Sequence, residues 1–295
     1  MAEIIDGKKI SEEIKREVKE QAAELKSKHG ITPGLAFILV GDNPASESYV
    51  KSKGRACVEL GFHSITERMP AETTQSSLLE KVRQFNNDPN IHGLLVQLPL
   101  PKHLNESEVI DAIDPKKDVD GFHPYNVGKL MIGEDTLKPC TPAGIQEMLV
   151  RSGNDPSGKH VVIVGRSNIV GKPIANILFQ KQAGANAVVT IAHTGAKDLS
   201  IYTRSADILI AAIGKPKFIS SNMLRPGVVV IDVGINRVND PSAKNGYRIV
   251  GDVDFEAASK IAKAITPVPG GVGLMTVAML MKNTLKAAKA FSGLA

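Results

Sequence analysis

Short apolar runs alternate with amphipathic segments along this chain, and the alternation limits the folds open to it more than any other feature. In the first part, strands are predicted over residues 35–40, 62–67 and 93–98, and helices over 10–25, 47–60 and 78–85. Later strands are predicted near Val161, Val188, Ile208 and Val228, with a last helix from about Gly273 to Lys289. Strands that alternate with helices in this way are typical of a parallel sheet covered by helices.

The alternation lapses between residues 114 and 141, where glycine, proline and aspartate are frequent. A loop of that length between regular segments is usually functional or crosses between domains. We therefore expect two α/β domains with a cleft between them. Because the last helix could pack back on the first domain, the predicted division is 1–140 plus 270–295 for one domain and 141–269 for the other.

The composition of the chain limits the kinds of ligand that it is expected to bind. The chain of 295 residues has 42% hydrophobic and 23% charged residues and a formal charge of +5, as expected of a globular protein with a modest basic surplus. Its basic residues form no block, and with 4 Tyr, 8 Phe and no Trp it lacks a base-stacking platform, so we expect no nucleic-acid partner. The surplus suits an anionic small ligand instead.

Cysteine content and hydropathy indicate the cellular compartment of the protein. Cys57 and Cys140 form no C-x-x-C pair and are expected to be reduced, structural thiols. The acid-rich amphipathic start fits neither a secretory signal nor a transit peptide, and no apolar run approaches membrane-spanning length. We expect a cytoplasmic protein with no membrane partner.

The stretch "VVIVGRSNIVGKP", residues 161–173, resembles a dinucleotide-binding turn. An apolar strand leads to Gly165, and a helix starting near Gly171 offers its N-terminal N–H groups to a pyrophosphate, with Pro173 in its first turn. The spacing departs from G-x-G-x-x-G, because Ser167 replaces the second glycine. An ordinary strand-turn-helix connection stays an alternative at this point.

The next strand bears on which dinucleotide binds. In NAD-binding folds an acid at the end of that strand holds the ribose hydroxyls. Here "VVTIA" is followed by His193, Thr194 and Gly195, without an acid, while Arg166 supplies a cation. This pattern favours NADP, and Asp198 nearby leaves NAD open.

Several residues are candidates for the chemistry. Tyr49 and Lys53 share one face of a predicted helix, and Gln97 lies at the carboxyl end of a predicted strand. The Tyr-x-x-x-Lys pair suggests short-chain dehydrogenases, but it precedes the glycine loop instead of following it, and simple packing of the two side chains is the alternative. Asp118 and Asp120 lie in the irregular crossing, and "PVPGGVG", residues 267–273, enters the last helix. No spacing typical of metal ligands or of a serine nucleophile is present, so no metal is expected.

Seven motifs together resemble the bacterial bifunctional methylenetetrahydrofolate dehydrogenase/methenyltetrahydrofolate cyclohydrolase family. They occur in the order "SYVKSK", "LLVQLPLP", "KDVDGFHPYNVGKL", "PCTPAGI", "GRSNIVGKP", "DVGIN" and "TPVPGGVG". The resemblance covers essentially the whole chain. One departure is Leu274, where the family usually has proline, which could loosen the entry to the last helix.

The resemblance implies NADP-dependent oxidation of 5,10-methylenetetrahydrofolate, hydrolysis to 10-formyltetrahydrofolate in the same cleft, a Rossmann-like second domain and a homodimer. It implies that Lys53 serves the cyclohydrolase step, Gln97 tunes Lys53, Tyr49 stacks on the folate and Asp120 anchors the pterin. Cofactor-binding residues by the same resemblance are Gly165, Arg166, Ser167, Thr194 and Ile235. Tetrahydrofolate derivatives would also meet Pro267, Gly270, Gly271 and Gly273.

Overall fold

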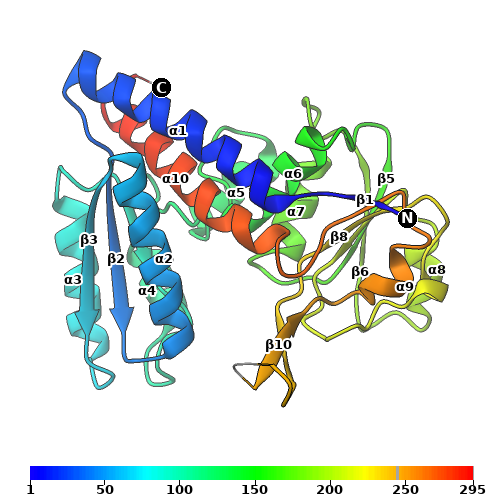
Figure 1. Cartoon of the computed structure of the whole chain (residues 1–295). Coiled ribbons are helices and arrows are strands. Elements are labelled where there is room, and N and C mark those ends of the chain that lie inside the picture. The colour runs from blue at the N-terminus through cyan, green and yellow to red at the C-terminus, as the bar shows by residue number, and fades with distance from the viewer. Residues whose placement is uncertain (244–245, 295) are drawn as a thin grey trace. The chain divides into compact units, whose positions relative to one another are not determined.

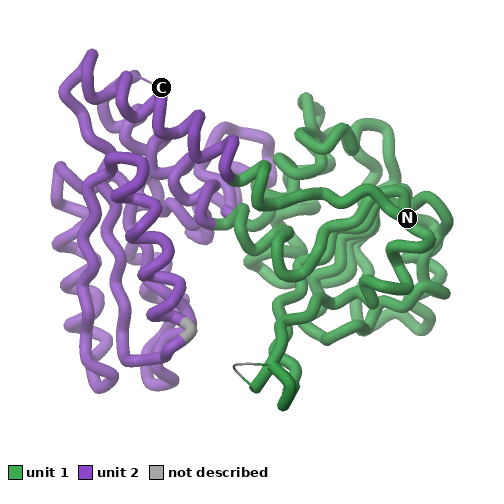
Figure 2. The backbone as a smooth tube through the Cα atoms, in the orientation of Figure 1, with its two compact units in different colours: residues 1–11, 141–276 green, residues 12–140, 277–295 purple. Residues whose placement is uncertain are grey.

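The computed structural model describes residues 1–243 and 246–294, and the chain forms two compact units (Figures 1 and 2). Unit 1 comprises residues 1–11 and 141–276, and unit 2 comprises residues 12–140 and 277–295. The predicted division differs at both ends of the chain. Residues 1–11 lie in unit 1 because β1 (Glu3–Ile4) pairs in parallel with β11 (Ala264–Ile265). Residues 270–276 also lie in unit 1.

Unit 2 contains a parallel sheet in the order β3-β2-β4. Its strands are β2 (Gly34–Val40), β3 (His63–Met69) and β4 (Gly93–Val96). Every residue of the central strand β2 is buried, as its uninterrupted apolar sequence predicts for a strand covered on both faces.

The helices that lie wholly or mainly in unit 2 are α1 (Gly7–His29), α2 (Pro44–Leu60), α3 (Gln75–Asn87), α4 (Glu106–Ala112), α5 (Pro124–Ile132) and α10 (Val272–Phe291). α3 shows why such segments become helical. Thr74 caps its N-terminus by accepting a hydrogen bond from the Ser77 N–H, and Leu78, Val82 and Phe85 form its buried face.

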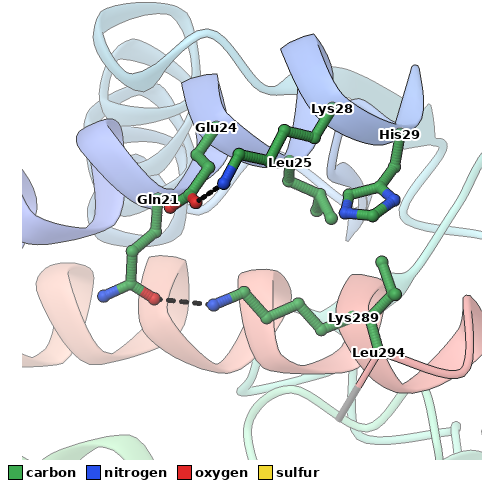
Figure 3. A pocket seen from close by; sticks show the side chains of 7 residues that line it. All are labelled: Gln21, Glu24, Leu25, Lys28, His29, Lys289 and Leu294. Carbon is green, nitrogen blue, oxygen red and sulfur yellow. Dashed lines mark hydrogen bonds and ion pairs between the residues drawn. The ribbon is translucent and has the colours of Figure 1, made fainter.

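The C-terminal parts of α1 and α10 lie side by side within unit 2 (Figure 3). Lys289 donates a 2.7 Å hydrogen bond to Gln21 across the two helices, while Lys28 pairs with Glu24 along α1 at 2.6 Å. Leu25 and Leu294 line the same shallow pocket. The Lys289–Gln21 bond therefore links the first and last long helices beside a pocket that two leucines help to line.

α5 falls inside the stretch predicted to be irregular. His123 caps it by accepting a hydrogen bond from the Tyr125 N–H, Pro124 occupies its first turn, and Gly133 ends it in the left-handed conformation. These start and stop signals are present in the sequence, but the segment between them is too short to show a helical period.

Unit 1 contains a parallel sheet in the order β1-β11-β8-β7-β5-β6. Besides β1 and β11, its strands are β5 (His160–Val164), β6 (Val188–Ala192), β7 (Ile208–Ala211) and β8 (Val229–Asp232). β5 lies between β6 and β7, so the strand order reverses there, and ligands of such sheets bind at the carboxyl ends of the strands beside that reversal. The predicted Rossmann-like unit is confirmed.

The remaining elements of unit 1 are α6 (Cys140–Arg151), α7 (Gly171–Leu178), α8 (Leu199–Thr203), a 3₁₀ turn (Ser221–Met223), α9 (Phe255–Ala258) and an antiparallel pair, β9 (Asn236–Asn239) and β10 (Tyr247–Val250). Among the residues described, no helix combines the length and apolar character needed to cross a membrane.

Candidate active site

In unit 2, Lys53 and Gln97 are in direct contact. α2 carries Lys53, whose side chain is buried, and Gln97 directly follows β4. Nζ of Lys53 donates a 3.1 Å hydrogen bond to Oε1 of Gln97, and Nε2 of Gln97 donates one of 2.7 Å to the Leu98 carbonyl. The second bond orients the amide so that its oxygen faces the lysine.

Asp120 lies close enough to Lys53 for the two charges to interact. Burial raises the pKa of Asp120 above its ordinary value, the positive charge of Lys53 opposes the increase, and Asp118 adds to it. The site therefore brings together an ammonium, an amide and a carboxyl group whose protonation depends on its neighbours.

Asp118 shapes the loop that carries Asp120. Its buried carboxylate accepts hydrogen bonds from the N–H groups of Gly121 and His123 and from Nδ2 of Asn126. Gly121 adopts a left-handed conformation, with φ of 72°. A Cβ at Gly121 would lie 2.5 Å from the nitrogen of Pro139, so glycine is required there.

Asn283 of α10 fastens the same loop, and nothing in the sequence pattern singled it out. Its Nδ2 donates 2.8 Å hydrogen bonds to the carbonyls of Val119 and Lys138. Cys140 is also buried here, where burial raises the pKa of its thiol well above the ordinary value and Asp120 adds to the effect. The thiol is therefore a neutral, structural group.

Tyr49 lies one helical turn before Lys53 and is 44% exposed. Its ring is free to stack on a ligand, whereas Lys53 reaches into the interior. Chemically, this part of unit 2 can hold a planar polar molecule and move a proton beside it.

In unit 1, the dinucleotide-like loop is shaped by two close backbone contacts. Gly165 follows β5 with φ of 133°, and a Cβ there would lie 2.2 Å from the Ala212 carbonyl oxygen. A Cβ at Gly171 would lie 2.3 Å from the carbonyl oxygen of Gly165. Both glycines are thus needed for contacts within the protein itself.

Ser167 takes part in the helix start. Its Oγ accepts hydrogen bonds from the N–H groups of Val170 and Gly171 at 3.2 and 3.3 Å. Arg166 and Ser167 are both exposed at the N-terminus of α7, where the positive end of the helix dipole favours an anion.

After β6, the chain turns through His193, whose Nδ1 accepts a hydrogen bond from the Gly195 N–H, and Thr194 is exposed. Asp198 is the nearby acid that left NAD as an alternative cofactor in the sequence analysis. In the structure it caps α8 by accepting hydrogen bonds from Ser200. The end of β6 accordingly presents no carboxylate from residues 193–195.

Ile235 and the glycine-rich loop also lie in unit 1. Ile235 is 51% exposed, and a Cβ at Gly273 would lie 3.3 Å from its Cδ1. A Cβ at Gly271 would lie 2.6 Å from the Pro267 carbonyl oxygen, and Gly270 has φ of 111°. Leu274 occupies the position where the family usually has proline. Its N–H donates a 3.3 Å hydrogen bond to the Gly271 carbonyl, a bond that proline could not make.

The fold and these residues define a two-unit α/β nucleotide-binding enzyme. Residues 5–120 match the family model for the tetrahydrofolate dehydrogenase/cyclohydrolase catalytic domain, and residues 139–292 match the model for the NAD(P)-binding domain of the same family. The chain belongs to the tetrahydrofolate dehydrogenase/cyclohydrolase family.

Relatives are similar over their full length. The chain is 56% identical over 295 residues to the bifunctional protein FolD of Syntrophobacter fumaroxidans, covering 100% of this chain and 99% of that protein. It is 49% identical to the crystal structure of the FolD enzyme of Campylobacter jejuni, with a TM-score of 0.92 and 98% and 99% of the two chains covered. A Trypanosoma brucei dehydrogenase-cyclohydrolase, solved with NADP cofactor and inhibitor, is 39% identical with a TM-score of 0.93, covering 100% and 99%.

These findings confirm the predicted family and the α/β fold class. The structure brings Lys53, Gln97 and Asp120 together in unit 2, and places Gly165, Arg166, Ser167, Thr194 and Ile235 on loops of unit 1. Besides Asn283, sequence reasoning missed Asp232 and Asp252, two buried carboxylates that organise the loops of unit 1. The individual roles of the predicted site residues stay predictions.

Proposed function

We propose that the protein oxidises 5,10-methylenetetrahydrofolate with NADP⁺ and hydrolyses the resulting 5,10-methenyltetrahydrofolate to 10-formyltetrahydrofolate. The observation that supports this best is the partly buried Lys53–Gln97 pair beside Asp120, inside the segment that matches the family's catalytic domain. The activity belongs to one-carbon metabolism.

The residues of unit 1 fit NADP. Gly165 stands where the strand order reverses, the N-terminus of α7 follows it, and Arg166 supplies an exposed guanidinium. A 2′-phosphate needs such a cation and excludes a carboxylate, and Asp198 is used as a helix cap. When bound, NADP⁺ accepts the hydride. Arg166, Ser167 and Thr194 would hold its phosphates, and Ile235 would lie beside its nicotinamide.

The oxidation needs no base from the protein. The lone pairs of the folate nitrogens assist departure of the hydride, which leaves the methenyl cation. The task of the protein is to hold the donor carbon in place. In this proposal Tyr49 stacks on the folate rings and Asp120 accepts hydrogen bonds from the pterin. Pro267, Gly270, Gly271 and Gly273 allow the substrate to approach the backbone.

Hydrolysis requires proton transfer. Water adds to the methenyl carbon, one carbon–nitrogen bond of the ring breaks, and one proton is released for each 10-formyltetrahydrofolate formed. Lys53 Nζ is the group we assign to that proton transfer, and Gln97 sets the direction in which Nζ donates. Asp120 lies close enough for its charge to act on the same lysine.

A single assay tests the proposal. Purified protein is mixed with 5,10-methylenetetrahydrofolate and NADP⁺, with NAD⁺ in a parallel sample, and the absorbance of reduced cofactor and methenyl product is followed. Reduction of NADP⁺ with transient or no build-up of the methenyl species is expected. Stoichiometric build-up would mean a dehydrogenase without effective cyclohydrolase activity, and absence of reduction would reject the proposal.

We also propose a cytoplasmic homodimer. β9 and β10 form a separate two-stranded sheet in the described part of the chain, and such a ribbon is marginally stable without further packing. The two cysteines are free thiols, which suits a reducing compartment. Light scattering should give twice the mass of the chain, and a monomer at micromolar concentration would reject the dimer.

A further inference from the structure

Four N–H groups converge on the carboxylate of Asp252, which is completely buried in unit 1. Oδ2 accepts hydrogen bonds from the backbone of Ile213 and Gly214 at 2.6 and 2.9 Å, and Oδ1 accepts one from Lys215 at 3.0 Å. The fourth donor is Nδ2 of Asn236, 2.8 Å from Oδ1. Three successive backbone donors around one anion form a fixed, charge-assisted arrangement.

The segment held in this way forms one wall of the dinucleotide loop. Ala212 connects this segment to β7, and its N–H donates a 2.9 Å hydrogen bond to the Val164 carbonyl. The carbonyl of Ala212 is the atom that leaves no room for a side chain at Gly165. A shift of residues 213–215 would therefore be transmitted to the backbone that receives the phosphates.

The other side of Asp252 holds the segment that carries Ile235. Asn236, its fourth donor, is the next residue in the chain. A Cβ at Gly234 would lie 2.4 Å from Oδ1 of Asp252, so this segment packs directly on the carboxylate. One side chain thus contacts both the segment beside the phosphate loop and the segment with the predicted nicotinamide contact.

Asp232 holds Asp252 in turn. Its Oδ1 accepts hydrogen bonds of 2.9 Å from the N–H groups of Asp252 and Gly234, and its Oδ2 accepts one of 2.9 Å from Val253. A Cβ at Gly251 would lie 1.8 Å from Oδ2 of Asp232. The backbone of Asp252 is therefore fixed independently of its side chain.

We propose that Asp252 is a positioning residue for NADP, which acts through residues 213–215 and Asn236 to set the distance between the phosphate loop at Gly165 and Ile235. This inference rests on the proposed function. Asp252 needs no contact with the dinucleotide, because its effect is to keep two separate binding segments in their ligand-ready positions.

The test is Asp252→Asn, which keeps the size of the side chain but turns one acceptor atom into a donor facing N–H groups. Asp254→Asn is the matched control, since Asp254 makes no capping hydrogen bond at the start of α9. A second control is Asp207→Asn. Asp207 lies at the opposite, amino end of β7, where its carboxylate accepts hydrogen bonds from His160 and Arg225, so that variant loses stability away from the loop.

The readouts are the equilibrium Kd for NADP⁺, from titration calorimetry without folate, and the kinetics of both reactions. We expect Asp252→Asn to raise the Kd and KM for NADP⁺ about tenfold or more. We expect kcat at saturating NADP⁺ and the hydrolysis of added methenyltetrahydrofolate to stay within about threefold of the unaltered protein. Both control variants should keep the original Kd.

An unchanged Kd in folded Asp252→Asn would overturn the inference, as would an equal rise in Asp207→Asn. If Asp252→Asn does not fold, Asn236→Ala removes one of the four donors and should raise the Kd about threefold. An unchanged Kd in that variant would equally overturn it. Failure of the proposed function is distinguishable, because the unaltered protein would then show no NADP⁺ reduction with methylenetetrahydrofolate.

Discussion

Lys53 and Gln97 form a partly buried hydrogen-bonded pair in which the lysine donates from Nζ to Oε1 at 3.1 Å. The two residues are 44 positions apart in the chain, and the pair forms because the face of α2 that carries Lys53 meets the carboxyl end of β4. We expect this pair to serve only the hydrolysis, because the oxidation needs no group of the protein that transfers a proton.

Replacing Lys53 by glutamine should therefore divide the activities. Hydrolysis of methenyltetrahydrofolate is expected to fall by at least about 100-fold, the usual contribution of a positioned acid–base group. NADP⁺ reduction should continue and methenyl product should accumulate, as followed by absorbance. Lys51→Gln, an exposed change two residues earlier, is the control and should leave both rates unchanged. Equal loss of both activities in Lys53→Gln would contradict the assignment.

Arg166→Ala should change the preference between the two dinucleotides. The guanidinium is exposed at the start of α7 and is assigned to the 2′-phosphate that only NADP carries. Its loss should raise the KM for NADP⁺ by about tenfold or more and change that for NAD⁺ much less. Steady-state kinetics with each dinucleotide provides its own control, and equal increases would rule out this role.

Asp232 should make stability depend on pH. Burial raises the pKa of Asp232 to about 6 in the folded protein, even though three backbone N–H groups favour its ionised form. In the unfolded chain Asp232 has the ordinary aspartate pKa of 3.8, so the folded state binds more protons between the two values.

The contribution of Asp232 is therefore fully present below about pH 4 and is lost as the pH rises through about 6. Relative to Asp232→Asn, the free energy of unfolding should fall by on the order of 2–3 kcal/mol between pH 4 and pH 7. Urea unfolding of both proteins at several pH values measures this difference. A difference that does not vary with pH would show that the folded-state pKa is not raised.

Gly165→Ala should destabilise unit 1. The change adds a Cβ 2.2 Å from the Ala212 carbonyl oxygen at a φ of 133°, so both sterics and backbone conformation oppose it. We expect a loss on the order of 3 kcal/mol in thermal or urea unfolding.

Gly128→Ala is the opposite case and the control for Gly165→Ala. A Cβ at Gly128 meets nothing within 4 Å inside α5, so alanine should stabilise the protein by about 0.5–1 kcal/mol. Similar unfolding midpoints for the two variants would show that the close approach of Gly165 and Ala212 is not rigid.

The sequence predicted the regular elements well where a local pattern carries the signal. β2 is a continuous apolar run, α3 has a helical stripe, and β5 leads into a glycine turn. β1 was not predicted, because a strand of two residues is too short to show a pattern of alternating hydrophobicity. Its position depends on pairing with β11, which is distant in the sequence.

The same limit applies to the site. Residue types and spacing pointed to Lys53, Gln97 and Asp120, but they gave no means of telling that Asp252 would gather four donors from two segments. A buried carboxylate that serves the backbone resembles any surface aspartate until the chain is folded. Likewise, the glycines of the dinucleotide loop suggested room for a ligand, whereas Gly165 leaves no room for a Cβ beside the Ala212 backbone and Gly171 leaves none beside the Gly165 backbone.

These two close backbone contacts have a consequence for anyone who wishes to redesign the protein. The shape of the loop is maintained by Gly165, Gly171 and Ala212, while Arg166, which is assigned to the 2′-phosphate, and Thr194, which is assigned to the phosphates, are exposed side chains. Architecture and selectivity are therefore encoded at different positions. A library that varies residues 166 and 194 and keeps both glycines should be able to exchange one dinucleotide for another without rebuilding the scaffold.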